Sequence, residues 1–264
     1  MGGFDLRLGD CLTGMARLRA ASVDLVVTSP PYNLGIRYGK FADTAERGSY
    51  LDWCVAWARE IRRVLRPNGS FFLNLGAAPA NPMLPHELML RLREIFVLQN
   101  TIHWIKAITM PNESGDGEIS RGHFKPINSP RFLNDCHEYI FHLTPNGKTL
   151  LDRLALGVPY ADKSNISRWQ HTGGRDRRCR GNTWFIPYET IQRRVKERPH
   201  PATFPVQLAV NCILLHGLTI TRKMLDPFLG IGSSAVAAQC CRLTNFVGFE
   251  IDEQYLEEAR RRLG

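Results

Sequence analysis

Long apolar runs are missing from this sequence of 264 residues. No stretch approaches the ~20 consecutive apolar residues that a helix needs to cross a bilayer. The opening residues, MGGFDLRLGD, also lack the basic and apolar regions of a secretory signal, and Leu6 stands where a myristoylated chain carries Ser or Thr. We therefore expect no membrane segment and a place in the cytoplasm.

Cysteine pairs with the spacing of a metal or redox motif are missing as well. The seven cysteines are an odd number, and no two of them are separated by two residues. This pattern argues against a disulfide framework and against a zinc site. Free cysteine behaves as a small hydrophobe, so we expect reduced thiols in a reducing compartment and no bound metal.

Acidic residues are scarce in one part of the chain. The sequence has a net charge of +9, and residues 146–201 alone hold twelve Lys and Arg against five Asp and Glu. Clustered cations bind nucleic acid by displacing the counterions of its phosphates. The same composition also suits an ordinary solvated surface, so charge alone leaves both interpretations open.

What the sequence does contain is a regular alternation of strand and helix patterns. The run 23–28 is rich in β-branched apolar residues, which is typical of a strand buried on both faces. The apolar residues of 50–65 recur at helical spacing, and Pro67 predicts a break after that helix. Strands are predicted at 4–8, 23–28, 70–75, 100–106, 138–143, 223–225 and 246–250. Helices are predicted at 12–18, 50–65, 84–96, 206–215, 233–241 and 253–263.

This alternation predicts an α/β fold with a doubly wound, mostly parallel sheet covered by helices on both faces. Two stretches interrupt the pattern. Residues 107–133 are rich in Pro, Asn, Gly and Ser, and residues 144–199 are basic and irregular. Long segments without regular structure inside a domain are usually functional or mobile. We interpret both as insertions at one edge of the sheet, with 107–133 as a mobile loop.

A glycine-rich turn lies near the carboxyl end of the chain. The segment 226–234, DPFLGIGSS, stands between a predicted strand and a predicted helix. Gly230 and Gly232 allow the backbone to turn tightly and approach a ligand, and the next helix presents N–H groups. Glu250 lies twenty residues after Gly230, where a carboxylate would meet a ribose diol. A purely structural turn is the alternative. The third glycine of the phosphate fingerprint is absent, which favours a nucleoside over a dinucleotide.

A second turn, TSPPYN at 28–33, follows an apolar strand. In an open α/β sheet, the loops beyond the carboxyl ends of the strands form the ligand crevice. Its two prolines remove backbone donors and leave carbonyl acceptors, and the hydroxyl of Ser29 can also accept. The ring of Tyr32 offers a flat face to a base. The turn therefore suits an amino group, and a rigid strand-end turn with a packed Tyr is the alternative.

Both turns resemble the motifs of one enzyme family. Residues 29–32 are similar to the catalytic tetrapeptide of the DNA amino-methyltransferases, and residues 226–233 are similar to their S-adenosylmethionine turn. The order, with the catalytic motif first, resembles that of the permuted beta class. Phe204 stands where this class often carries Lys. Shorter pieces that also resemble the class are Gly9-Asp10-Cys11, Trp104-x-Lys106, His137-Glu138-Tyr139-Ile140 and His200-Pro201-Ala202-Thr203-Phe204-Pro205.

The resemblance implies a Rossmann-like methyltransferase fold and S-adenosyl-L-methionine as cofactor. Residues 1–143 would form the catalytic half of the domain, 144–199 the target-recognition insertion and 200–264 the cofactor-binding half. The implied catalytic residues are Ser29, Pro30, Pro31 and Tyr32. The implied cofactor-binding residues are Asp10, Cys11, Thr28, Pro205, Asp226, Pro227, Phe228, Gly230, Gly232, Ser233, Ser234 and Glu250. The expected DNA-binding residues are Lys106, Arg168, Arg175, Arg177, Arg178 and Arg180.

By the same resemblance, the chain methylates the exocyclic amine of a base that is flipped out of duplex DNA. Ser29 is typical of the cytosine-N4 enzymes of this family, and adenine N6 is the first alternative. A methyltransferase acting on RNA or on a protein amide, and a non-catalytic DNA-binding protein, are further alternatives. The implied partners are double-stranded DNA, a second copy of the chain and a separate restriction endonuclease, and the implied location is the nucleoid.

Overall fold

One large sheet forms the centre of the protein. The computed structural model describes residues 3–36, 38–79, 81–113, 115, 117–124, 127–187 and 203–264. The strands of the large sheet are β1 (Phe4–Leu8), β2 (Val23–Thr28), β3 (Leu65–Leu75), β4 (Val97–Ile105), β7 (His137–Thr144), β8 (Thr183–Phe185), β9 (Met224–Asp226) and β10 (Phe246–Glu250). A separate pair consists of β5 (Ala107–Pro111) and β6 (Glu118–Gly122). The helices are α1 (Cys11–Ala16), α2 (Arg47–Val64), α3 (Leu84–Leu92), α4 (Ser164–Arg168), α5 (Val206–His216), α6 (Ser233–Cys240), α7 (Glu253–Leu263) and the 3-10 turn η1 (Gln170–Thr172).

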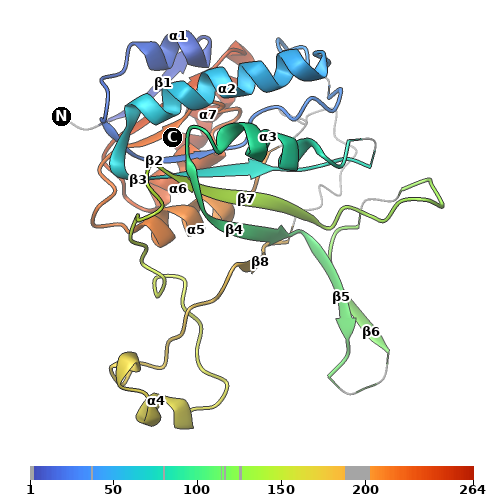
Figure 1. Ribbon diagram of the computed structural model, residues 1–264, viewed down its shortest axis with the longest axis vertical. Helices are drawn as coiled ribbons and strands as arrows, with labels where there is room; N and C mark the ends of the chain where they lie inside the picture. Colours follow the sequence, from blue (N-terminus) through green and yellow to red (C-terminus); the bar gives the residue numbers. More distant parts are fainter. Residues whose placement is uncertain are drawn as a thin grey trace.

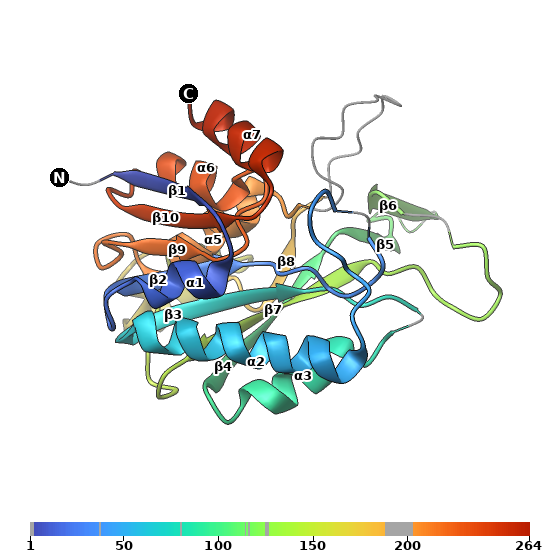
Figure 2. The same ribbon diagram turned by 90° about the horizontal axis from the view of Figure 1, so that it is seen from above.

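The large sheet has the strand order β1-β10-β9-β2-β3-β7-β4-β8. Neighbouring strands are parallel, except that β7 runs antiparallel to both β3 and β4. Helices α1, α2 and α3 pack on one face, and α5, α6 and α7 pack on the other (Figures 1 and 2). This arrangement confirms the predicted doubly wound, mostly parallel α/β sheet.

Side-chain patterns explain why the central elements form where they do. Every residue of β2 is buried, as its continuous apolar pattern predicts. In α2, Tyr50, Cys54, Trp57 and Ile61 recur at helical spacing, and all four are buried against the sheet. Glu46 caps the start of this helix, because its carboxylate accepts a hydrogen bond from the N–H of Ser49 at 2.9 Å.

The chain order reverses at the centre of the sheet. Strand β9 comes late in the chain, yet it pairs with β2 through Leu25–Met224 and Val26–Leu225. Beyond β9 the sheet continues to β10 and β1, and beyond β2 it continues to β3. Such a switch point opens a crevice at the carboxyl ends of the two strands. The glycine-rich turn follows β9 and the Ser-Pro-Pro-Tyr turn follows β2, so the fold brings both motifs to one crevice.

The predicted mobile loop at 107–133 contains regular structure. Strands β5 and β6 form an antiparallel hairpin that projects below the sheet (Figure 1). The N–H of Asn112 donates to Gly117 O at 3.0 Å, and Gly117 has a positive φ of 75°, which favours glycine. The polar, glycine-rich composition therefore reflects a hairpin turn, and the expectation of a loop without strands was wrong.

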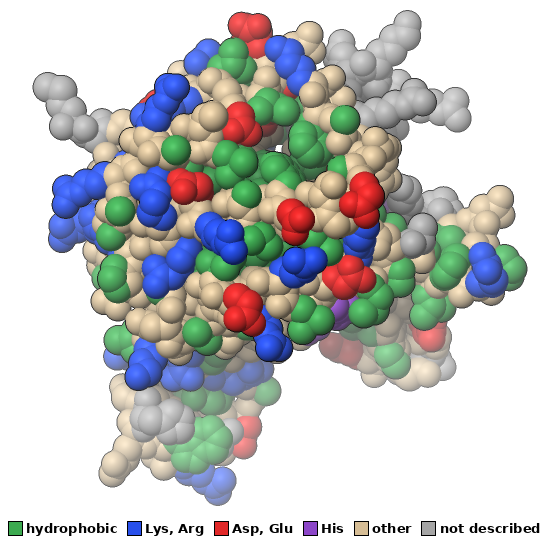
Figure 3. All heavy atoms as spheres, turned by 45° about the horizontal axis from the view of Figure 1, so that its top comes forward, with side chains coloured by type: hydrophobic (Ala, Val, Ile, Leu, Met, Phe, Trp, Pro, Cys, Tyr) green, Lys and Arg blue, Asp and Glu red, His purple; other side chains and the backbone are tan. Residues whose placement is uncertain are grey.

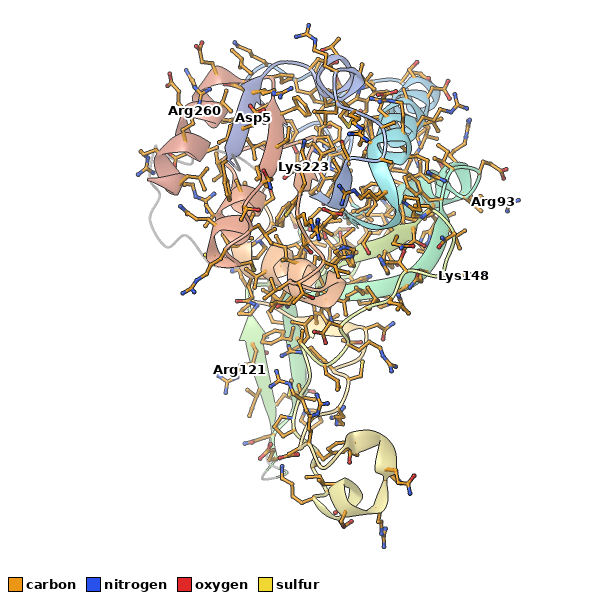
Figure 4. The ribbon with its side chains drawn as sticks, turned by 90° about the vertical axis from the view of Figure 1, so that its left-hand side faces the viewer. Asp5, Arg93, Arg121, Lys148, Lys223 and Arg260 are labelled. Carbon is orange, nitrogen blue, oxygen red and sulfur yellow. The ribbon has the colours of Figure 1, made fainter. Side chains whose placement is uncertain are left out.

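The basic insertion also carries secondary structure. Its β8 strand extends the sheet by pairing with β4 through His103–Thr183. The lobe that holds α4 and η1 lies on the same side of the sheet as the β5–β6 hairpin, on which Arg121 is labelled (Figures 1 and 4). Residues 188–199 of the predicted insertion lie outside the described residues.

The helix predicted at 50–65 ends as expected, because α2 ends at Val64, but the strand predicted to begin at 70 begins earlier. Strand β3 begins at Leu65 and runs through Pro67. The register shifts between the pairs Val23–Leu65 and Leu25–Ser70, so Pro67 lies in an irregular stretch that does not need its missing N–H. None of the helices in the described ranges is long and apolar enough to cross a bilayer.

Candidate active site

A cavity lies at the switch point, between the turn after β2 and the turn after β9. Both motifs contribute to its wall, together with residues that follow Tyr32 in the chain and with Tyr255 of α7. Hydrophobic side chains surround a hollow in the face shown in Figure 3, and charged side chains lie at its margin. A cavity with apolar walls and a few polar groups is the usual form of a small-molecule site.

The carboxylate of Asp226 joins the two turns. Asp226 is only 1% exposed and accepts hydrogen bonds from Thr28 Oγ1 at 2.5 Å, from the hydroxyl of Ser234 and from the N–H of Phe228 at 3.0 Å. Burial raises the pKa of Asp226 to about 6, and the three donors oppose that rise. Thr28 directly precedes Ser29, so this carboxylate fixes the Ser-Pro-Pro-Tyr turn against the glycine-rich turn.

Two further contacts shape the glycine-rich turn. Glu250 accepts the N–H of Gly230 at 2.7 Å with one carboxylate oxygen and the N–H of Asp252 at 2.9 Å with the other. Burial raises the pKa of Glu250. Gly232 has a φ of +79°, and a Cβ placed there would lie 2.9 Å from the Cβ of Ala259 in α7. Gly232 therefore serves the packing of the turn on α7, whereas the sequence suggested that it approaches a ligand.

The Ser-Pro-Pro-Tyr turn is held in place from α2. Tyr50 Oη donates to the carbonyl oxygen of Pro31 at 2.7 Å, so this carbonyl already has a partner. Ser29 Oγ lies 2.6 Å from Tyr32 Oη. Ser29 and Pro30 both line the cavity. They are the members of the turn whose oxygens can meet an amino group there.

Tyr32 connects this turn to polar side chains of neighbouring strands. Its hydroxyl donates to Glu138 Oε2 at 3.1 Å, and Asn74 Nδ2 donates to Tyr32 Oη at 2.8 Å and to Glu138 Oε2 at 2.7 Å. Lys106 Nζ donates to Glu138 Oε1 at 3.0 Å, and these two side chains are only 19% and 16% exposed. Burial and the charge of Glu138 raise the pKa of Tyr32, so the phenol keeps its proton. Sequence reasoning did not indicate Asn74, although a polar residue at the carboxyl end of a strand next to β2 is a signal that could have found it.

The segment after Tyr32 is held by a second buried carboxylate. Asp43 is 2% exposed and accepts hydrogen bonds from the backbone N–H groups of Asn33, Leu34 and Ile36 at 2.7, 3.0 and 3.1 Å. Sequence reasoning missed Asp43, because its partners are backbone groups that leave no side-chain signature. The residues of this segment that line the cavity are Tyr38, Lys40 and Phe41.

Most of the predicted site residues meet at the cavity. All four residues of the tetrapeptide, Ser29, Pro30, Pro31 and Tyr32, line it. The predicted cofactor residues on its wall are Asp10, Cys11, Pro227, Phe228, Gly230, Ser233 and Glu250. The predicted cofactor residues that do not line it are Thr28, Pro205, Asp226, Gly232 and Ser234. Of the predicted segment 200–205, Thr203 and Phe204 line the cavity, and residues 200–202 lie outside the described residues.

Neither thiol nor metal chemistry is indicated at this cavity. Burial and the neighbouring Asp10 raise the pKa of Cys11 to about 12, so its thiol stays protonated and is a poor nucleophile. Within the described ranges, no group of three or more His, Cys, Asp or Glu side chains is arranged to hold a metal ion.

Two of the arginines predicted to bind DNA have structural partners in the α4 lobe. Arg177 Nε donates to Leu154 O at 2.9 Å, and Arg180 Nε donates to Leu156 O at 3.1 Å. These bonds tie the strand-like stretch around Arg178 to the chain entering the lobe, where Val158 and Arg178 form a β-bridge. Arg177 and Arg180 therefore brace the lobe, a role that the sequence did not predict.

The other predicted DNA-binding residues differ in exposure. Arg168 and Arg175 are exposed, and their guanidinium groups have no hydrogen-bond partner among the described residues. Arg178 is also exposed and makes only a 3.4 Å contact with a neighbouring carbonyl. Lys106 lies beside the tetrapeptide, where it pairs with Glu138, rather than on an open surface.

The chain matches one family model over most of its length. The N6/N4 methyltransferase model, described as DNA methylase, covers residues 23–261. The type II methyltransferase M.ScaI of Streptomyces caespitosus is 28% identical over 97% of this chain and 79% of its own length. The DNA adenine methyltransferase YhdJ of Escherichia coli (strain K12) is 26% identical over 97% of this chain and 81% of its own length.

Solved structures share the fold. The PvuII DNA methyltransferase, described as cytosine-N4-specific, has a TM-score of 0.70 at 18% identity and matches 100% of this chain and 87% of its own. The M1.HpyAVI–SAM complex has a TM-score of 0.60 at 16% identity and matches 98% of this chain and 100% of its own. At these identities the likeness concerns the fold, and it confirms the predicted Rossmann-like methyltransferase architecture.

Replacing Asp226 with Ala removes the shared acceptor of the two turns. We expect the free energy of unfolding to fall by about 2 kcal/mol or more, because each buried donor left without a partner costs about 1–3 kcal/mol. Urea unfolding of the parent and the Asp226→Ala variant at neutral pH measures the difference. Equal unfolding midpoints would show that the carboxylate does not hold the turns together.

Asp226→Asn is the matched control, since it keeps the shape of the side chain and one carbonyl oxygen. The pKa of Asp226 is about 6 when folded and 3.8 as a free side chain, so the folded state binds the proton more tightly. As the pH falls from about 6 toward 4, the parent should therefore gain stability relative to Asp226→Asn.

Proposed function

The chain belongs to the N6/N4 DNA methylase family, and from this premise we propose that it methylates the exocyclic N4 of cytosine at specific sites in duplex DNA. It is a DNA amino-methyltransferase, and the choice of base is the proposal. Ser29 carries the proposal, because Ser at this position is typical of cytosine-N4 members, whereas Asp or Asn is typical of adenine-N6 members. The PvuII enzyme, which shares the fold, is described as cytosine-N4-specific. The 26% identity to a DNA adenine methyltransferase supports adenine N6 as the second candidate.

S-adenosyl-L-methionine is the cofactor of this reaction, and the charges of the cavity fit it. When bound, it supplies a methyl group on a positively charged sulfonium. Asp10, Glu250 and Asp252 line the cavity, and their carboxylates suit a cationic ligand. Each carboxylate oxygen of Glu250 accepts one backbone N–H and has a further lone pair, with which it can accept a ribose hydroxyl.

The apolar part of the cavity suits the adenine of the same ligand. The ring of Trp53 lies 5.4 Å, centroid to centroid, from both Phe41 and Phe228. These three side chains all line the cavity and offer flat apolar surfaces to a heterocycle. In the proposed assignment, Phe228 and Pro227 of the glycine-rich turn contact the cofactor, and Asp226 acts from behind by fixing the turn.

Ser29 and Pro30 hold the target amine in the proposed mechanism. The base must leave the duplex before its amino group can reach the cavity. The exocyclic amine is a poor nucleophile, so the rate depends on its position and on acceptors that stabilise the charge developing on its N–H groups. Ser29 Oγ and the Pro30 carbonyl oxygen are these acceptors. The hydroxyl of Tyr32 holds Ser29 Oγ through a 2.6 Å hydrogen bond, and the ring of Tyr32 can stack on the base.

The basic insertion supplies DNA affinity in this proposal. Arg168 and Arg175 are exposed on the α4 lobe and are available to phosphates, whereas Arg177 and Arg180 maintain the shape of the lobe. The β5–β6 hairpin extends on the same side of the sheet. A homodimer and a separate restriction endonuclease stay predictions of the family resemblance.

Expression of the chain in a host without DNA methylation tests the assigned base. Genome sequencing with modification-sensitive reads should find N4-methylcytosine at one recurring sequence, which gives the base, its position and the recognition site together. The same host without the gene is the control. N6-methyladenine at a recurring site would show that adenine N6, the second candidate, is the target instead of cytosine N4. An unmodified genome with methylated RNA or protein would overturn DNA as the substrate.

The double variant Arg168→Ala/Arg175→Ala tests the phosphate contacts of the lobe. We expect weaker DNA binding and a slope of log affinity against log salt that is smaller by about 2, because each lost phosphate contact removes about 0.9 from the slope. Cofactor affinity should stay the same. Fluorescence anisotropy with a labelled duplex at several salt concentrations measures both quantities.

Arg177→Ala is the matched control for this pair. It removes the same charge but also the bonds to Leu154 O and Ala155 O, so we expect faster proteolysis within the lobe in addition to weaker DNA binding. If Arg168→Ala/Arg175→Ala leaves the salt slope unaltered, these two side chains do not face phosphate.

A further inference from the structure

A continuous row of hydrogen-bonding groups leads from the cavity wall to a buried ion pair. Ser29 Oγ lies 2.6 Å from Tyr32 Oη, Tyr32 Oη lies 3.1 Å from Glu138 Oε2, and Glu138 Oε1 lies 3.0 Å from Lys106 Nζ. The members come from the turn after β2, from β7 and from the residue after β4. Ser29 meets the target amine in the proposed mechanism, so the row connects the reacting group to a carboxylate.

The available hydrogens fix the direction of the row. Asn74 Nδ2 has two hydrogens and three acceptors within reach, and the contacts of 2.8 Å to Tyr32 Oη and 2.7 Å to Glu138 Oε2 are shorter than the 3.4 Å contact to Ser29 Oγ. The two short contacts therefore use both hydrogens. Tyr32 has one hydrogen, and the carboxylate of Glu138 at 3.1 Å is a nearer and stronger acceptor than the carbonyl oxygen of Asn74 at 3.3 Å. The hydrogen of Ser29 then points to Tyr32 Oη. The lone pairs of Ser29 are left for a donor in the cavity, as an amino group requires.

The orientation of Asn74 is itself constrained. Reversing its amide would place a carbonyl oxygen against the carboxylate of Glu138, and two acceptors repel each other at that distance. In the observed orientation, Asn74 Oδ1 is buried and has no hydrogen-bond partner among the described residues. Leaving a buried carbonyl oxygen unpaired costs free energy. The hydrogen bonds from the amide nitrogen to Tyr32 and Glu138 must offset this cost, so they determine the orientation of the Asn74 side chain.

We propose that Glu138 is the final acceptor of the proton that leaves the target amine, which it receives through Ser29 and Tyr32. As the target nitrogen forms its bond to the methyl carbon, the carbon–sulfur bond of the cofactor breaks, its electron pair stays on sulfur, and the nitrogen becomes cationic. The nitrogen then gives a proton to Ser29 Oγ, Ser29 gives its own to Tyr32 Oη, and Tyr32 gives its own to Glu138. Both hydroxyls end neutral, the methylated amine is neutral, and Glu138 holds the proton. The proposal rests on amino-methyl transfer and applies equally to cytosine and adenine.

The surroundings of Glu138 suit this task. Lys106 balances the charge of the carboxylate and holds it in place at 3.0 Å. A Cβ at Gly76 would lie 2.9 Å from Tyr32 Cε2 and 3.2 Å from Glu138 Cδ, so a glycine at this position allows the phenol and the carboxylate to meet. The phenol of Tyr32 keeps its proton because burial and the charge of Glu138 raise its pKa, and a protonated phenol can pass a proton on.

Glu138→Gln tests the proposal, because the amide keeps the shape and an accepting oxygen but takes up no proton near neutral pH. We expect the single-turnover methylation rate to fall by about a hundredfold or more, the lower range for a positioned proton acceptor. Dissociation constants for cofactor and DNA should stay at parental values. The variant should stay folded with a lower urea unfolding midpoint, because Lys106 loses the charge that balances it. Glu138→Asp keeps a carboxylate and should restore part of the rate.

Tyr32→Phe interrupts the same row one step earlier. It should lower the rate by a similar factor, and the double variant Tyr32→Phe/Glu138→Gln should be no slower than either single variant, because both remove one path. Glu87→Gln is the control outside the row. It alters the pair with Arg47 at 2.7 Å between α2 and α3 and should leave the rate unchanged.

Three results would overturn the relay. They are a Glu138→Gln variant that methylates at the parental rate, rate losses that add in the double variant, and a loss expressed as weaker DNA binding at an unchanged rate. The parental rate is measured in the same assay. If only the relay is wrong, the parent protein still methylates DNA in this assay. If the substrate assignment is wrong, the parent protein itself shows no methylation of DNA, so the two failures are distinguishable.

Discussion

The buried carboxylate of Asp226 is the contact on which the rest of the site depends. Parallel pairing of β2 with β9 brings the two strands side by side, but it does not fix the turns that extend beyond them. Three hydrogen bonds to Asp226, from Thr28, Ser234 and Phe228, do so. Two motifs from distant parts of the chain thus form one wall of the cavity at a fixed spacing. Asp226 acts from behind that wall, since it does not line the cavity.

The polar groups around the cavity differ in how their charge is compensated. Burial raises the pKa of Asp226 and of Glu250, and backbone or hydroxyl donors hold both carboxylates in place. Glu138 is compensated by Lys106 instead. At position 29 the chain has a neutral hydroxyl, where the adenine-N6 members of the family typically carry Asp or Asn. In the proposed relay, this hydroxyl passes a proton through Tyr32 to the carboxylate of Glu138. The negative charge is therefore separated from the target amine by the hydroxyl groups of Ser29 and Tyr32.

The elements that sequence analysis predicted are those with local signals. The apolar run of β2, the glycine-rich turn and the alternation of strands and helices each depend on neighbouring residues, and strand order at a switch point brings the motifs together. Contacts between distant segments were not predictable. The position of Asn74 at the end of a strand next to β2 was a signal, but its contact with Glu138 on β7 was not visible in the sequence. Asp43 resembles an ordinary polar residue, because its partners are backbone groups. Arg177 donates a hydrogen bond to the carbonyl oxygen of Leu154, whereas the guanidinium of Arg175 has no partner among the described residues. In the sequence, both count equally toward the positive charge of the insertion.

In the proposed mechanism, the turn beginning at Ser29 performs the chemistry in the site that Asp226 assembles. Single-turnover methylation of duplex DNA with a tritiated methyl donor, comparing the parent with Ser29→Ala, tests it most directly. We expect near-parental affinity for cofactor and DNA, with a methylation rate lower by about one to three orders of magnitude, the range for losing one preorganised hydrogen-bonding group. A Ser29→Ala variant that methylates as fast as the parent would contradict the account and leave the tetrapeptide as a rigid turn at the end of β2.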